Sequence, residues 1–175
     1  NDMLTELYDA DASPWRMRAG IPGEPAPVEQ TLLWASRGSA KTTGLRGLVL
    51  HAALNALETG ILVICNDADV ARPWVATVAE WAARLPPEAA EVYADVKVSR
   101  TQLLAVIETD GVEIAMHPRG WASGSIRGIN HRGVRPSLVV LDDVESIRNQ
   151  SSERVREMSA KRMNGEVMGV FPLNG

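Results

Sequence analysis

The stretch TLLWASRGSAKTT, residues 31–43, decides the fold. Its apolar beginning, residues 31–35, is bounded by turn-forming residues and indicates a short strand buried in a parallel sheet. A loop of small residues follows at 36–40. From residue 41 to about 58, apolar side chains recur at steps of three and four, which predicts a helix with one face packed on the sheet. A strand, a small-residue loop and a helix that opens with Lys-Thr are the context of a P-loop, GxxxxGK followed by Ser or Thr.

This loop suits triphosphate binding, although both consensus glycines are replaced, by Ala35 and Ala40. Backbone N–H groups at a helix N-terminus point at phosphate oxygens. Lys41 is expected to reach the β- and γ-phosphates, and the Thr42 hydroxyl to join the shell of a Mg²⁺ ion. Alanine resists positive φ, so the loop must avoid left-handed torsions at positions 35 and 40 or carry strain there. The predicted ATP-binding residues are Ser36, Arg37, Gly38, Ser39, Ala40, Lys41, Thr42 and Thr43.

A second motif, LVVLDDVE, occupies residues 138–145. Its four apolar residues predict a buried strand, and ligands bind at the C-terminal ends of such strands in open α/β sheets. Asp142 is expected to hold Mg²⁺ through water, and Asp143 to act as general base for the attacking water. Glu145 is the alternative base. Acids after a strand are also typical of a solvated turn or a helix cap, but the P-loop upstream favours ATP hydrolysis.

The rest of the chain predicts one α/β domain behind an irregular lead-in segment. Residues 1–30 are rich in proline and glycine, and the ATPase domain is assigned to residues 31–175. Strands that alternate with helices indicate a mainly parallel central sheet flanked by helices. The other expected elements are a strand at 61–65, a helix at 70–84, a hairpin of 104–108 and 112–116 around Asp110-Gly111, and a helix from 149 or 151 to about 163.

Composition bears on the class of function. The net charge of −4 is not typical of a dedicated DNA-binding domain, although Arg127, Arg132 and Arg135 form a local basic cluster. No apolar run is long enough to span a membrane. The single cysteine, Cys65, lies in an apolar run and is expected to be a small buried side chain. The histidines lack metal-ligand spacing, so no zinc site is predicted.

Two segments resemble the terminase large subunits of bacteriophages, the motors that package DNA. SRGSAKTT at 36–43 is similar to the P-loop (Walker A) of that family, in which an arginine follows the serine and the glycine pattern is often degraded. GSIRGINHRGVRPSLVVLDDVES at 124–146 is similar to the segment that leads into its second acidic motif (Walker B). There an Arg-Gly pair and an Arg-Pro pair precede an apolar strand that ends in two acids. The resemblance covers about residues 31–150.

This resemblance implies a P-loop NTPase of the ASCE type that hydrolyses ATP with Mg²⁺ and drives double-stranded DNA into a procapsid. Arg37 matches the family's P-loop arginine, which is implicated in transition-state stabilisation or communication between subunits. The family usually has glutamate directly after the metal aspartate, so the base remains open between Asp143 and Glu145. The implied partners are double-stranded DNA, a portal protein, a terminase small subunit and further copies of the chain in a ring, in the host cytoplasm. The nuclease domain that follows in the family is not expected within these residues.

Two other functions fit the motifs. One is a different P-loop DNA-dependent ATPase, such as a helicase-like remodeller. The other is a nucleotide-binding or assembly module that has lost hydrolysis, an alternative that the missing glycines allow. The motor interpretation requires Lys41 and Thr42 to face Asp142 across one bound magnesium–triphosphate, and a wide separation of Lys41 from Asp142 would exclude it.

Overall fold

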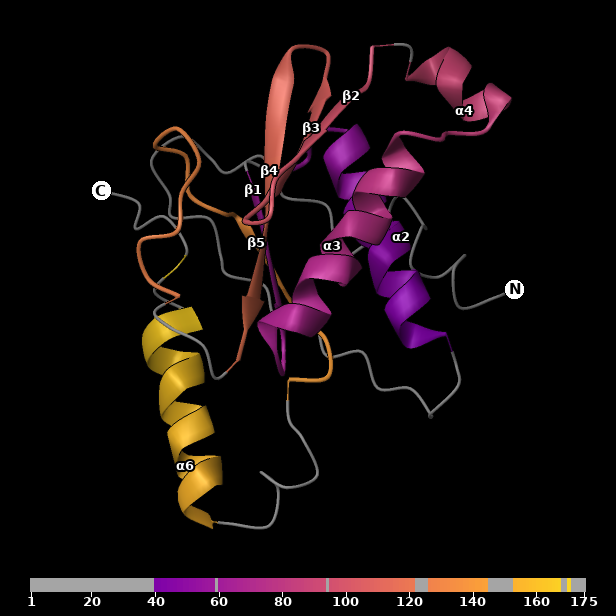
Figure 1. Ribbon diagram of the computed structural model, residues 1–175. Helices are drawn as coiled ribbons and strands as arrows, with labels where there is room; N and C mark the ends of the chain where they lie inside the picture. The colour runs from indigo at the N-terminus through magenta and orange to yellow at the C-terminus, as the bar shows by residue number, and fades with distance from the viewer. Residues whose placement is uncertain are drawn as a thin grey trace, which may run out of the picture. The chain divides into compact units, whose positions relative to one another are not determined.

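The computed structural model describes residues 40–58, 60–93, 95–121, 126–144, 153–167 and 170. The expected lead-in segment and the strand at 31–35 lie outside these residues. None of the described helices is both long and apolar enough to cross a membrane. In chain order (Figure 1) the elements are α2 (Lys41–Leu54), β1 (Gly60–Cys65), α3 (Ala68–Ala82), α4 (Pro87–Val92), β2 (Lys97–Arg100), β3 (Ala105–Thr109), β4 (Val112–Gly120), β5 (Leu138–Leu141), α6 (Glu153–Arg162) and a π-helix, η1 (Met163–Val167).

The strands form one five-stranded sheet in the order β2-β3-β4-β1-β5. β1 pairs in parallel with β4 and with β5, and all six of its residues are buried, as expected for a strand covered on both faces. β3 pairs antiparallel with both β2 and β4. The mainly parallel sheet expected from the sequence is therefore a mixed sheet in the described residues, with an antiparallel half beside a parallel half.

A tight turn causes the antiparallel half. Asp110 and Gly111 both have positive φ, 50° and 76°, which is the backbone of a type I′ hairpin turn. A loop of two residues can join only antiparallel neighbours, so the hairpin predicted from the Asp-Gly pair is confirmed. β4 then continues beyond the expected end at 116, because its residues up to Gly120 pair with β1 after β3 has ended at the Ala105–Met116 pair. Pro118 is tolerated there because only one neighbouring strand remains.

Alternating side chains give the sheet two apolar faces. Ile61, Val63 and Cys65 of β1 belong to the core that packs against α2 and α3, whereas Leu62 and Ile64 pack with residues of the 126–129 segment and η1. Figure 1 shows α2 and α3 on one side of the sheet and α6 on the other. The same alternation in β5 sends Val140 to the α2–α3 side and Leu141 to the other. The next residue, Asp142, therefore points toward α2 and α3.

The helix that begins at Lys41 ends earlier than the expected residue 58. It stops at Leu54, and Ala56 takes a left-handed φ of 48°. Leu57 N–H donates to Ala52 C=O at 3.0 Å, and Ala56 N–H to Ala53 C=O at 3.2 Å, which is a Schellman closure. The apolar spacing runs on through this closure, so periodicity alone overestimates the helix.

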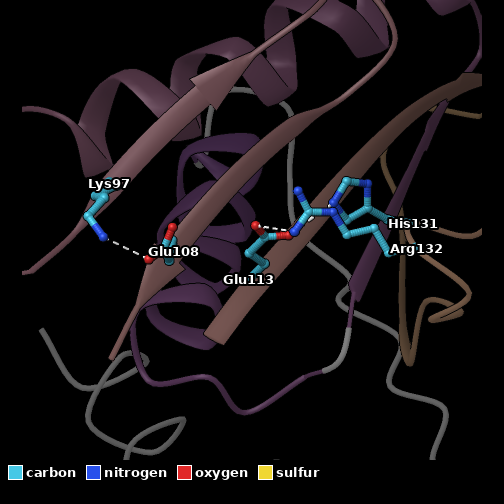
Figure 2. A network of polar contacts seen from close by, with 5 residues as sticks. All are labelled: Lys97, Glu108, Glu113, His131 and Arg132. Atoms are coloured by element: carbon cyan, nitrogen blue, oxygen red, sulfur yellow. Dashed lines mark hydrogen bonds and ion pairs between the residues drawn. The ribbon is translucent and has the colours of Figure 1, made fainter. Parts of the chain in front are cut away.

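Two elements were not expected, α4 and β2. No residue of α4 is buried, and β2 is a four-residue edge strand with largely exposed side chains, so neither has an apolar pattern to reveal it. Lys97 of β2 donates to Glu108 of β3 at 2.8 Å, a cross-strand ion pair seen in Figure 2. A charged, short strand at the sheet edge also discourages pairing with other chains.

A polar network lies on the sheet face opposite α2 and α3. Glu113 of β4 accepts a hydrogen bond from Arg132 at 2.6 Å and contacts Nε2 of His131 at 3.2 Å (Figure 2).

His117 lies four residues after Glu113 on β4 and is buried, with 4% of its surface exposed. Burial, with smaller contributions from the charges of Arg119 and His131, lowers the pKa of His117 from 6.5 to about 4. The neutral imidazole is thus part of the folded state.

This burial predicts a pH-dependent stability. The pKa of His117 is 6.5 in the unfolded chain and about 4 in the folded chain, so the unfolded chain binds the proton first as the pH falls. The free energy of unfolding therefore has its full value above pH 6.5 and decreases as the pH falls toward 4. The loss should amount to about 1–3 kcal/mol. Urea unfolding between pH 7 and 4 should show this slope in the wild type and a shallower slope in His117→Gln. Ile114→Val, also buried in β4, should lower stability without changing the slope, and equal slopes in all three proteins would contradict the assignment.

Candidate functional site

The N-terminus of α2 and the C-terminal end of β5 meet on the α2–α3 side of the sheet. The Thr42 hydroxyl donates to Asp142 Oδ2 at 2.8 Å, across 100 positions of sequence. Lys41 Nζ lies 4.0 Å from Asp142 Oδ1 and 3.1 Å from Asp143 Oδ1. The structure therefore brings together four residues, Lys41, Thr42, Asp142 and Asp143. The wide separation of Lys41 from Asp142 that would exclude the motor interpretation is not observed.

Asp142 is almost fully buried, with 4% of its surface exposed. Its backbone N–H donates to Ile64 C=O at 3.0 Å, which continues the ladder between β1 and β5. Its Oδ2 accepts two hydrogen bonds, from Thr42 and from the indole N–H of Trp74 at 3.0 Å. Its Oδ1 is buried and accepts no hydrogen bond within the described part of the chain. Since an unsatisfied buried carboxylate oxygen is costly, Oδ1 is suited to a metal ion or to a metal-bound water.

Lys41 lies at the solvent side of this carboxylate. Its side chain is 31% exposed, and its partner Asp143 is 78% exposed. Ion pairs this open to water contribute little to stability, so Lys41 can exchange Asp143 for an anionic ligand at small cost. The backbone of Asp143 is left-handed, with φ of 46°, a conformation that aspartate tolerates better than most residues.

The start of α2 is suited to an anion. Its first turn contains no acidic residue, and Ala40, the N-cap, makes no capping hydrogen bond with its methyl side chain. The first N–H groups of a helix have no partner within the helix, and such groups are suited to bind an oxyanion. Ala40 has φ of 57° and ψ of 24°, so the position where a P-loop has glycine is left-handed in this chain. Of the two outcomes expected at position 40, the strained one is observed.

Trp74 is the site residue that sequence reasoning missed. The sequence predicts only the helix at 70–84 that contains Trp74, whereas the hydrogen bond from Trp74 to Asp142 depends on how α3 packs against β1 and β4, beside the end of β5. The guanidinium of Arg46, one turn after Thr42 on α2, lies 5.5 Å from the centre of the Trp74 ring, in cation–π range. No pattern in the sequence connects Arg46, Trp74 and Asp142.

Cys65 lies at the end of β1, level with Asp142 at the end of β5. It is free and 1% exposed. Burial, and then the negative charges of Asp142 and Asp143, raise the pKa of its thiol to about 11. The expectation of a small buried cysteine is confirmed, and the thiol stays protonated at neutral pH.

Several predicted site residues lie outside the described part of the chain: Ser36, Arg37, Gly38, Ser39 and Glu145. Among the described residues, no cluster of three or more His, Cys, Asp or Glu side chains is arranged to hold a metal ion. A metal at Asp142 would therefore take its remaining ligands from the Thr42 hydroxyl, water and oxygens of a bound ligand.

The left-handed alanine predicts a stabilising substitution. Ala40→Gly removes a side chain that a positive φ disfavours, and we expect the free energy of unfolding to rise by about 1 kcal/mol in urea titrations. Ala83, at the end of α3, is exposed and right-handed, so Ala83→Gly should lower stability by about 0.5–1 kcal/mol. Loss of stability of the same size in both variants would show that Ala40 is not strained.

Comparisons with known proteins do not assign the chain to a family. Comparison of the chain with protein-family models, with curated proteins and with solved structures gave no match. The chemistry of the site is therefore argued from the positions and environments of its own residues.

Proposed function

We propose that the chain binds and hydrolyses ATP with Mg²⁺ at the contact between α2 and β5. One observation carries the proposal: Thr42 and Lys41, at the start of a helix, meet the buried Asp142 at the end of a strand, at 2.8 Å and 4.0 Å. A hydroxyl, an ammonium group and an unsatisfied carboxylate oxygen beside the N-terminus of a helix suit a metal–triphosphate better than a metal ion alone or a phosphate alone. The P-loop pattern around residues 36–43 supports the same ligand.

Each side chain has a distinct task in this proposal. The N–H groups at the start of α2 and Lys41 bind the β- and γ-phosphate oxygens, and Thr42 and Asp142 hold the metal. Mg²⁺, when bound, neutralises charge that develops on the phosphate oxygens. Asp143 accepts a proton from water as the water oxygen bonds to the γ-phosphorus; the bond from the γ-phosphorus to the bridging oxygen breaks, and ADP and phosphate are the products. Glu145 is the alternative proton acceptor.

The larger role rests on resemblance. The segments at 36–43 and 124–146 support an ASCE-type motor domain of a terminase large subunit, which would act on double-stranded DNA in a host cytoplasm. Its partners would then be a portal protein, a small subunit and further copies of this chain, with Arg37 acting within one subunit or between two. A different DNA-dependent P-loop ATPase would use the same site, and stimulation of turnover by DNA alone, without a procapsid, would favour it.

Replacement of the P-loop lysine tests the phosphate contact. Lys41→Ala should weaken binding of a fluorescent ATP analogue about 10- to 100-fold, because a charge-assisted hydrogen bond is lost, and it should abolish measurable turnover. The fold should persist by far-UV circular dichroism, since Lys41 is partly exposed and does not belong to the apolar core. Lys97→Ala is the matched control, because Lys97 pairs with Glu108 on the β2–β3 edge, and it should bind as the wild type does. Unchanged binding by Lys41→Ala would reject the site.

Replacement of the buried aspartate tests the metal contact. Asp142→Asn can still accept from Thr42 and Trp74, so the fold should be kept, but turnover at fixed Mg²⁺ should fall about 100-fold or more. Asp69→Asn, at the exposed start of α3, is the control and should hydrolyse ATP normally. Normal Mg²⁺-dependent turnover by Asp142→Asn would refute the metal assignment. Mg²⁺-dependent ATP binding by the wild type, with near-zero turnover in both the wild type and Lys41→Ala, would instead favour a nucleotide-binding module.

A further inference from the structure

We propose that Trp74 is a positioning residue that fixes which oxygen of Asp142 faces the metal. The inference deepens the proposed function and rests on it. Trp74 belongs to α3, outside both sequence motifs, and none of the P-loop chemistry argued above requires a tryptophan there. Its role follows from one contact, the hydrogen bond from Nε1 to Asp142 Oδ2 at 3.0 Å.

The two oxygens of Asp142 have different surroundings. Oδ2 accepts from the Thr42 hydroxyl and from the Trp74 indole, whereas the buried Oδ1 accepts no hydrogen bond from the described residues. A carboxylate rotates readily about its last torsion, which has a broad two-fold profile, so a single donor would leave its orientation loose. Two donors on the same oxygen hold the group in one orientation, with Oδ1 on the side of Lys41.

Trp74 is well suited to this task because its own position is fixed. The residue is 1% exposed and sits in the core between α2, α3 and the sheet. An indole N–H is a donor only, so it can support the ionised carboxylate but cannot compete for the metal. Arg46 covers the ring from α2, with its guanidinium 5.5 Å from the ring centre. Thr42 and Arg46 are four residues apart on α2, so one helix face supplies both a donor to Asp142 and the cation over Trp74.

Loss of the indole N–H should therefore act on the metal more than on the nucleotide. Outer contacts that orient a metal ligand typically change metal affinity 10- to 100-fold. If Trp74 only fills the core, Trp74→Phe should lower stability and leave the Mg²⁺ requirement unchanged, because phenylalanine keeps much of the apolar volume. The two roles thus predict different results for one substitution.

The first experiment measures the Mg²⁺ dependence of equilibrium binding of a fluorescent ATP analogue. Trp74→Phe should raise the Mg²⁺ concentration at half-maximal binding about tenfold, with near wild-type binding once Mg²⁺ is saturating. Trp81→Phe is the matched control: Trp81 lies on the same helix and is partly buried, and its indole N–H is not hydrogen-bonded to any of the described residues. It should leave the Mg²⁺ dependence unchanged. An unchanged dependence in Trp74→Phe, with normal binding by the wild type, overturns the inference and leaves the ATP site intact.

A second measurement keeps the proposal testable if Trp74→Phe does not fold. The indole N–H of Trp74 gives one of five tryptophan side-chain resonances in a ¹⁵N-labelled wild-type chain. Without any ligand, Asp142→Asn should shift this resonance and speed its hydrogen exchange, because a neutral amide is a weaker acceptor than a carboxylate. Addition of Mg²⁺ and ATP to the wild type should shift it as well. If Asp142→Asn leaves the Trp74 resonance unchanged, the inference about Trp74 is overturned. If the wild type does not bind Mg²⁺ and ATP, both the proposed function and this inference are overturned.

Discussion

The buried carboxylate of Asp142 is the constraint on which the rest of the site depends. Removal of a charge from water costs several kcal/mol unless other groups compensate it. The compensation comes from three directions: the Thr42 hydroxyl on α2, the Trp74 indole on α3 and the ammonium group of Lys41. The side chain of Asp142 therefore links both α2 and α3 to the end of β5. Polar contacts, as well as apolar packing, help to position these two helices on the sheet.

The sheet explains why these groups meet where they do. β1 lies between β4 and β5, and its parallel pairing with β5 in the register Ile64–Leu141 brings Cys65 level with Asp142. The start of α2 faces that same end of the strands, where open α/β sheets gather ligands. Ala40 and Asp143, two of the non-glycine residues with positive φ, lie on either side of the contact. Such torsions persist only where the surrounding structure holds them, and they occur here beside the ion pair of Lys41 with Asp143.

Local patterns were enough to predict part of this arrangement. A run of four apolar residues predicted the strand Leu138–Leu141, and an Asp-Gly pair predicted the hairpin. The Lys-Thr pair and the Asp-Asp pair indicated the two segments that meet at the site. Other features depend on tertiary contacts that a single sequence does not encode locally. The closure at Ala56 interrupts an apolar pattern that continues along the chain, and β2 lacks such a pattern. The hydrogen bond from Trp74 to Asp142 depends on the packing of α3 against β1 and β4.

The protonated, enclosed thiol of Cys65 has a practical consequence. It is the only cysteine of the chain, and its exposure is 1%. Maleimides and other thiol probes react with accessible thiolates, so the native chain provides a nearly silent background for labelling at neutral pH. A dye or spin label attached to one cysteine introduced at the surface would report on that position alone, with no need to replace the native residue beside the acidic pair.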